Sequence, residues 1–144
     1  MIFLGTYFHN IDSKNRLSMP AKFASSLGEK IVVSKGFDGC LEIRSSKSFE
    51  EYANKLMSLT QTKKDSRIVI RQLLANAANI ELDNARRILI PLNLLKEANI
   101  KTSVVVIGIG NKIEIWDEQK YNQFKLETDK TYESIAERLE ETNE

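Results

Sequence analysis

The chain has 144 residues, of which 42% are hydrophobic and 28% are charged, so we expect one globular domain or two very small ones. Its single cysteine excludes an internal disulfide framework, and no apolar run approaches the ~18 residues of a membrane span. The net charge of +1 hides an asymmetry, because residues 114–144 hold four Lys/Arg and ten Asp/Glu, which leaves the rest of the chain basic. This basic part is either ordinary surface charge or a surface for a polyanion. We expect a cytoplasmic protein without a signal peptide.

An internal repeat dominates the sequence. IDSKNRLSMP begins at Ile11 and LDNARRILIP begins at Leu82, 71 residues later. In each copy an Asp stands four residues before an Arg, and an apolar stretch then ends in one of the two prolines. Each copy predicts a strand, a turn, a second strand and a short helix with Pro at its first position. The predicted helix ends are Gly28 and Asn99, which readily adopt a left-handed conformation.

A second pair of similar segments follows each short helix. Residues 32–49 align with residues 104–121 at an offset of 72, and both predict a hairpin of two strands. Alternation places Glu42 and Glu114 on the outward face, together with Cys40. A lone unit of about 45–50 residues lacks a sufficient core, so the two copies are expected to pack on each other, and interleaving of their strands is one way to do so. The prediction is one β-rich, pseudo-symmetric α+β body.

Helices are predicted between the two copies and after the second copy. Ser48 and Glu51 have the spacing of a capping box that starts one helix, and another is predicted from about Asp65 to Ala78. Asp117 is predicted to cap one long C-terminal helix. The sequence therefore predicts a first unit at 1–49, connecting helices at 50–78, a second unit at 79–121 and a C-terminal helix at 122–144.

Residues for catalysis or metal binding are sparse. The only histidine, His9, falls in a predicted strand without a nucleophile or base that would complete a catalytic group. Cys40 has neither a CxxC partner nor a paired histidine. The segment GIGNK at 108–112 lacks the glycine pattern of a phosphate loop and predicts a hairpin turn. We therefore expect no enzyme activity, no cofactor, no metal site and no small-molecule substrate.

The repeated Asp-x-x-x-Arg pattern has two interpretations. Asp12 with Arg16, and Asp83 with Arg87, could each pair across a turn and only fix the register of two strands. The alternative is DNA binding: pseudo-symmetry would present two turns on one face, with two cations in each. The additional cations are Lys14 and Arg86. Arg can grip guanine through two hydrogen bonds, Lys commonly anchors phosphates, and the Asp residues would support the turns. The residues alone leave both interpretations open.

The chain resembles the MraZ family, regulators of the bacterial division and cell wall cluster that are built from two AbrB-like (SpoVT-AbrB) units. The resemblance covers about residues 1–125 and rests on FLGTYFHNIDSKNRLSMPAKF, LLANAANIELDNARRILIP and VVVIGIGNKIEIWDEQKY. It implies a swapped-hairpin β-barrel, ring-like homo-oligomers, a place at the nucleoid, and binding to G-rich direct repeats upstream of the protein's own operon. The DNA-contacting arginines of the family map onto Arg16 and Arg87.

Two positions depart from the family pattern, which commonly has Gly immediately before the motif Arg. Asn15 and Arg86 stand there in this chain. Asn tolerates a left-handed turn, whereas Arg86 implies either a different turn or a strained one that adds a cation at the DNA. Both residues are therefore candidate DNA contacts. The alternative function is an antitoxin-like, protein-binding module with the AbrB fold.

Overall fold

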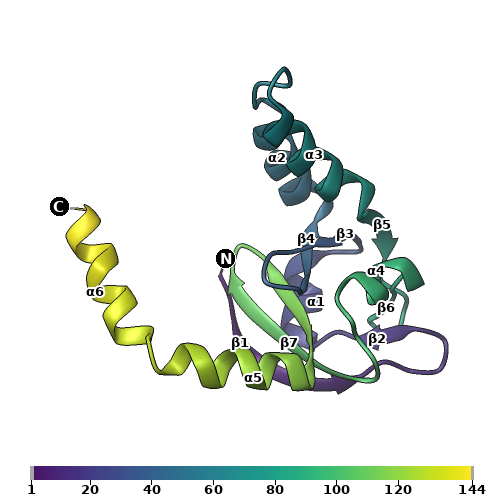
Figure 1. Cartoon of the computed structure of the whole chain (residues 1–144). Helices are drawn as coiled ribbons and strands as arrows, with labels where there is room; N and C mark the ends of the chain where they lie inside the picture. Colours follow the sequence, from purple (N-terminus) through teal and green to yellow (C-terminus); the bar gives the residue numbers. More distant parts are fainter. Residues whose placement is uncertain (1, 144) are drawn as a thin grey trace.

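The computed structural model describes residues 2–143 as an α+β protein with two antiparallel sheets and six helices (Figure 1). The strands are β1 Phe3–Asn10, β2 Arg16–Ser18, β3 Lys30–Lys35, β4 Leu41–Ser45, β5 Ala77–Glu81, β6 Arg87–Leu89, β7 Ser103–Gly110 and β8 Ile113–Asp117. The helices are α1 Ala21–Leu27, α2 Ser46–Met57, α3 Lys64–Ala75, α4 Leu92–Glu97, α5 Glu118–Asp129 and α6 Tyr132–Asn143.

The two copies of the repeat share their sheets. The larger sheet has the order β1-β7-β8-β4-β3-β5, and the smaller one pairs β2 with β6. Strand β1 of the first copy therefore pairs with β7 of the second, and β5 of the second copy pairs with β3 of the first. The larger sheet is open among the described residues, because β1 and β5 form its two edges. A closed barrel is thus not seen there.

A pseudo-twofold axis relates the copies and passes through both sheets. Glu42 lies directly opposite Glu114 where β4 pairs with β8, and Leu17 lies directly opposite Ile88 where β2 pairs with β6. The strand register corrects one part of the sequence alignment. Val33 pairs with Ile43 whereas Val106 pairs with Ile115, so β3 matches β7 at an offset of 73 rather than 72. The identical valines and glycines of these strands are consequently not structural equivalents.

The main core lies between the larger sheet, the β2–β6 ribbon and the short helices. Branched aliphatic side chains from both copies fill it, including the fully buried Leu17, Ile43 and Ile88. The rings of Phe3 and Tyr7 pack edge-on against Phe23 of α1. Burying such side chains from both copies provides the hydrophobic free energy that a single unit lacks, at about 25 cal/mol per Å² of apolar surface.

The opposite face of the central hairpins is also covered, contrary to the expectation that Glu42 and Cys40 face outward. Both side chains are 1% exposed. Helix α5 packs here through Phe124, whose ring centroid lies 5.0 Å from that of Trp116 in β8. Glu42 forms ion pairs with Arg44 and Lys112, each at 2.7 Å. The alternation in these strands was predicted correctly, but the second face is sealed by helices and by a buried ion-pair network.

Several helix ends differ from the sequence prediction. Helix α2 begins earlier, because the Ser45 side chain accepts the Ser48 N–H and acts as the cap. The prolines occupy the N-cap position, one residue before the predicted one. Helix α3 ends at Ala75, since the chain then enters β5. Asp117 precedes α5 but accepts the Lys101 N–H instead of a helical one.

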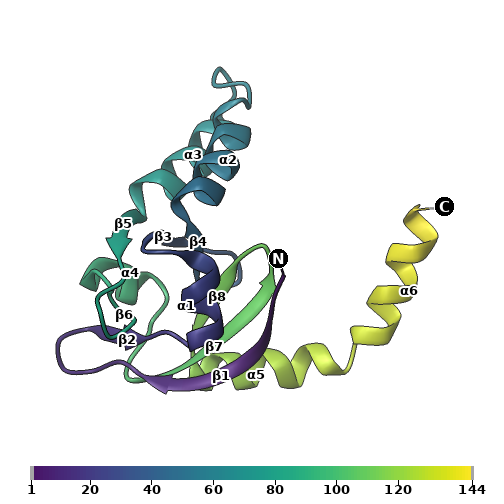
Figure 2. The ribbon, with the colours of Figure 1, turned by 180° about the vertical axis from the view of Figure 1, so that it is seen from behind.

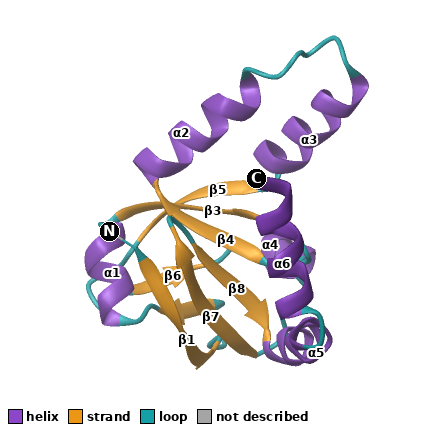
Figure 3. Ribbon diagram, turned by 90° about the vertical axis from the view of Figure 1, so that its left-hand side faces the viewer, coloured by secondary structure: helices purple, strands orange, loops and turns teal. Residues whose placement is uncertain are grey.

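The chain's C-terminal part forms two helices where the sequence predicted one. A break at residues 130–131 separates α5, which lies along the sheet, from α6, which projects away from the body (Figures 1 and 2). Helices α2 and α3 instead form a hairpin that rises above β3 and β5 (Figure 3). Among the described residues, no helix has the length and apolar character needed to cross a membrane.

Candidate nucleic-acid interface

The first turn is built around the carboxylate of Asp12. Its Oδ1 accepts the backbone N–H groups of Lys14 and Arg16, both at 2.9 Å, and its Oδ2 accepts the Arg16 Nε–H at 2.8 Å. The Asp12 N–H donates to the Arg16 carbonyl at 3.0 Å, and the Asn15 N–H donates to the Asp12 carbonyl at 3.0 Å. One side chain thereby fixes both the backbone of the turn and the orientation of its arginine.

The second turn repeats these contacts around Asp83. Its Oδ1 accepts the N–H groups of Ala85 at 2.8 Å and Arg87 at 2.9 Å, and its Oδ2 accepts the Arg87 Nε–H at 2.8 Å. The backbone bonds between Asp83 and Arg87, and between Arg86 and Asp83, are also matched at 3.0 Å. The spacing of four residues is needed because an Asp can bond both the backbone and the guanidinium only across a turn of this length.

The residue before each arginine has the same left-handed conformation. Asn15 has φ of 62° and Arg86 has φ of 58°. Their carbonyls accept N–H groups from the other copy, Ile90 for Asn15 and Met19 for Arg86, both at 2.9 Å. The structure thus excludes a different geometry for the second turn, which keeps the geometry of the first. Arg86 therefore adopts this conformation at a strain of order 1–3 kcal/mol, the usual cost for a non-glycine residue in this region.

The β2–β6 ribbon brings the two turns together. Leu17 and Ile88 point into the core at 0% exposure, so the alternate residues of both strands face outward. Arg16 pairs with Leu89 in the register, which places Arg87 diagonally across the ribbon from Arg16. Diagonal neighbours of this kind are about 7–8 Å apart, and their Cβ atoms are somewhat closer. Both arginines therefore share one outward face, as pseudo-symmetry predicted.

Electrostatics favour the charged state of both carboxylates. Hydrogen bonds from the Arg16 backbone N–H and from its side chain lower the pKa of Asp12 below its ordinary value. The same bonds from Arg87 lower the pKa of Asp83. The ionised carboxylates hold each arginine by Nε, and among residues 2–143 the Nη atoms of Arg16 and Arg87 have no protein acceptor. Each guanidinium edge is thus oriented and unoccupied.

Neighbouring side chains complete this face unequally. Lys14 is exposed at the tip of the first turn, where the second turn has Ala85. Arg86 is exposed in the second turn, where the first has the half-buried Asn15. The strand register adds Ser18 and Leu89, which flank the arginines on the outward face and which the sequence interpretation missed. The signal that identifies them is the period-two alternation that continues from each arginine.

The residues considered for catalysis lie elsewhere. His9 is half-buried in β1, and Cys40 packs beneath α5, where burial raises the pKa of its thiol and leaves it unsuited to a thiolate role. Cys40, Glu42 and Glu114 place potential ligand atoms within 4.8 Å of one another. Arg44 and Lys112 already neutralise Glu42, so this cluster is accounted for as an ion-pair network.

Comparison with known proteins gives one consistent result. The model of the family described as "MraZ protein, putative antitoxin-like" matches twice, at residues 2–72 and 73–143. A transcriptional regulator MraZ from Mycoplasmoides gallisepticum is 44% identical over 140 residues, which cover 97% of this chain and 99% of the relative. The corresponding regulators of Mesoplasma florum and Thermoanaerobacter sp. are 41% and 42% identical, with 96–98% of each chain covered.

Proposed function

The chain belongs to the MraZ family, whose curated relatives are named transcriptional regulators, and from this premise we propose that it regulates transcription by sequence-specific DNA binding. The DNA contacts are Arg16 and Arg87, on one face of the β2–β6 ribbon, with Lys14, Asn15 and Arg86 beside them. The DNA is the set of G-rich direct repeats that the family resemblance implies upstream of the division and cell wall operon.

The observation that carries the proposal is the matched presentation of the two arginines. Each is held through Nε by a carboxylate, so the Nη edge is preorganised for an acceptor pair such as guanine O6 and N7. The diagonal separation of about 7–8 Å is close to two base-pair steps of about 3.4 Å each. A turn that only fixed strand register would need the Asp bonds but not two outward guanidinium edges.

The proposal includes assembly and cellular place. One subunit presents few base contacts, so affinity for successive repeats is gained when several subunits bind together as a ring-like homo-oligomer. The protein acts in the cytoplasm at the nucleoid and needs no cofactor. The division of the chain into two units, connecting helices and a C-terminal helical part also belongs to the proposal, with its boundaries moved to the starts of α2, β5 and α5 at Ser46, Ala77 and Glu118. The swapped-hairpin barrel belongs to it as well, supported by the pairing of β1 with β7 and of β5 with β3.

Fluorescence anisotropy with labelled upstream DNA and with scrambled DNA, at two salt concentrations, tests the proposal. We expect the Arg16→Ala/Arg87→Ala variant to lose sequence preference while its oligomer size is unchanged. Lys47→Ala/Lys130→Ala is the matched control, because it removes two exposed charges away from the ribbon. It should retain the preference. Unchanged binding by the arginine variant would leave the repeated motif as a structural turn.

A second variant separates charge from hydrogen-bond geometry. Arg16→Lys/Arg87→Lys keeps both charges but removes the two-pronged guanidinium edges. We expect nonspecific, salt-dependent binding to remain and preference for the repeats to fall by about 1–3 kcal/mol per lost guanine contact. Full specificity in this variant would assign the arginines to phosphate contacts only.

The antitoxin-like module is retained as the second candidate because the matching family description names that likeness. In this case the chain would purify with a stoichiometric protein partner, and DNA binding would be absent. Mass analysis of the tagged protein purified from its own host distinguishes the two outcomes.

A further inference from the structure

Helix α6 has an apolar stripe that the molecule itself does not cover. Every side chain from Tyr132 to Glu141 is exposed, including Tyr132 at 72%, Ile135 at 38% and Leu139 at 60%. These three residues have the i, i+3, i+7 spacing of a helix that lays one face into a groove. An isolated helix of 12 residues is marginal in water, so α6 needs a packing partner.

Helix α6 diverges from α5 and does not fold back on its own chain (Figures 1 and 2). Six residues separate α2 from α3, which pack against each other, but only residues 130–131 separate α5 from α6. In Figures 1 and 2, α6 and the α2–α3 hairpin project from different sides of the body. A partner for the stripe must therefore come from another molecule.

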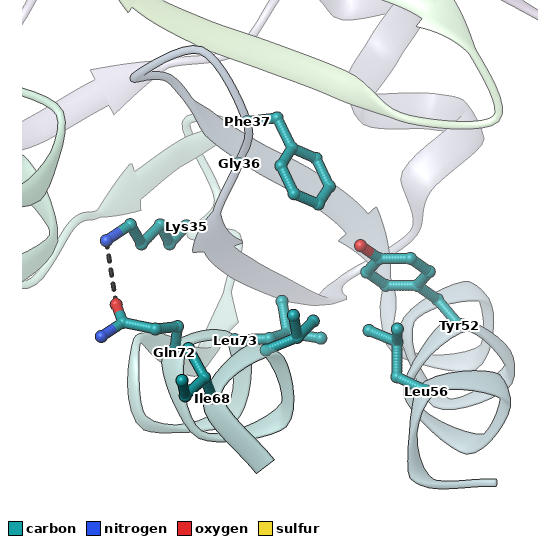
Figure 4. A pocket seen from close by; sticks show the side chains of 9 residues that line it. Lys35, Gly36, Phe37, Tyr52, Leu56, Ile68, Gln72 and Leu73 are labelled. Carbon is teal, nitrogen blue, oxygen red and sulfur yellow. Dashed lines mark hydrogen bonds between the residues drawn. The ribbon is translucent and has the colours of Figure 1, made fainter. Parts of the chain in front are cut away.

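The α2–α3 hairpin provides a groove of matching character. A space of about 500 Å³ lies between the two helices and the end of β3 (Figure 4). Tyr52 and Leu56 of α2 and Ile68 and Val69 of α3 line it, and Phe37 stands at its edge. Phe37 is 67% exposed, Ile68 44% and Val69 40%. Such a concentration of exposed apolar side chains marks a binding surface.

Charge indicates which occupant suits the groove. Residues 132–141 of α6 contain four Glu and one Arg, whereas the described residues that line the groove include the cation Lys35 and no acidic residue. Glu133 and Glu140, seven residues apart, form a row beside the apolar stripe of α6. Lys64 stands one turn before Ile68 on α3, beside the groove. An acidic amphipathic helix and an apolar groove with lysines beside it thus match in apolar surface and in charge.

We propose that α6 of one copy docks in the α2–α3 groove of a neighbouring copy, with Tyr132, Ile135 and Leu139 inside the groove. The contact joins two different surfaces, so repeating it produces a closed ring or an open chain of subunits. From the proposed function, this inference takes only that the protein forms homo-oligomers. It adds the interface through which the subunits would assemble. DNA binding by the ribbon is a separate property.

Disulfide trapping between two variants that each carry one added cysteine tests the contact directly. Chains carrying Leu139→Cys are mixed with chains carrying Val69→Cys under mild oxidation, and native Cys40 stays buried. We expect a mixed dimer to accumulate at least tenfold faster than with Ile109→Cys, a matched control that is also 40% exposed but lies on β7. Equal trapping at both positions would overturn the proposal.

The oligomer size of surface variants provides the second test. Ile135→Asp/Leu139→Asp changes only exposed side chains, so the fold is kept, and light scattering should show the assembly reduced to monomers. Leu126→Asp, at a residue of α5 that is 65% exposed, is the control and should assemble like the wild type. A wild-type protein that is monomeric, or an α6 variant that keeps its assembly, would each overturn the proposal.

The two tests separate this interface from the DNA-binding function. If the α6 variant keeps its assembly but the wild type binds the repeats, the docking proposal fails and the function stands. If assembly depends on α6 but no DNA is bound, the docking proposal stands and the function fails.

Discussion

The turns of the two copies match bond for bond, whereas the helix pairs that follow the copies do not. Asp12 contacts Arg16 in the same way as Asp83 contacts Arg87, although the three residues inside each turn differ. Helices α2 and α3 pack together, but α5 and α6, joined by a shorter connection, diverge (Figure 1). The copies are alike at the ribbon, where pseudo-symmetry places two arginines on one face. They differ in the helix pairs that follow, because α2 and α3 contact each other whereas α5 and α6, over the residues that the structure describes, do not pack together.

The largest loss of stability is expected from substitutions at the pseudo-twofold axis, where the two copies meet. Glu42 and Glu114 lie opposite each other, but Glu42 neutralises the buried Arg44, while Glu114 accepts one bond from the Trp116 indole at 2.9 Å. Glu42→Ala leaves a buried cation unpaired and should lower the free energy of unfolding by about 3–5 kcal/mol. Glu114→Ala should lower it by about 1 kcal/mol. Urea denaturation measures both, and equal losses would contradict the assigned network.

Position 108 shows a second, smaller asymmetry. A Cβ on Gly108 would clash with the backbone nitrogen of Leu4 in β1, whereas the structurally equivalent residue of the first copy is Lys35. We expect Gly108→Ala to displace β1 and to cost about 1–3 kcal/mol. Lys35→Ala, on the half-exposed equivalent, should change stability by about 0.5 kcal/mol or less. A neutral Gly108→Ala in urea denaturation would show that β1 yields without cost.

The two left-handed residues allow the turns to be compared directly. Arg86→Gly removes the conformational strain, so it should raise the free energy of unfolding by about 0.5–1 kcal/mol. Asn15→Gly should change it by less than about 0.5 kcal/mol, because Asn already tolerates positive φ. Thermal denaturation gives both values. The same Arg86→Gly protein, used in the DNA assay, reports whether this cation contributes, since a lost phosphate contact also reduces the salt dependence.

The smallest predicted effect is a shared dependence on pH. Hydrogen bonds in the turns lower the pKa of Asp12 and Asp83 below the ordinary 3.8. Their contribution to stability is therefore present above pH 3.8 and is lost as the pH falls through the lower folded values. The difference in unfolding free energy between the wild type and Asp12→Asn/Asp83→Asn should shrink as the pH is lowered from 6 to below 3. A difference that grows on acidification would contradict this sign.

Much of the fold and of the candidate site follows from local sequence patterns. The spacing of Asp and Arg, the prolines and the helix ends predicted a turn at the same place in both copies, because each depends on residues close together in the chain. The geometry of the second turn was left open by Arg86. Gly28 and Asn99 both have positive φ, as predicted. The face that presents Arg16 and Arg87 follows from alternation combined with pseudo-symmetry.

The errors arise where the answer depends on distant contacts. The alignment of β3 with β7 was wrong by one residue, since runs of valine do not fix a register by themselves. Glu42 was predicted to face outward because alternation shows on which side of the sheet a residue lies, but not whether helices cover that side. The partner of Lys112 is 70 residues away in the chain. The break before α6 was missed because its helical periodicity resembles that of α5.

The pseudo-symmetry of the ribbon has a consequence for polarity. A half-turn about the axis exchanges Arg16 with Arg87, so these two side chains alone would read a DNA site equally well in either direction. Direct repeats have a direction. Under the proposed function, the sense in which a subunit sits on its site is set by the three pairs of positions where the turns differ: Ser13 against Asn84, Lys14 against Ala85 and Asn15 against Arg86. Exchanging these residues between the turns should reverse the subunit on its DNA while leaving the two arginines in place.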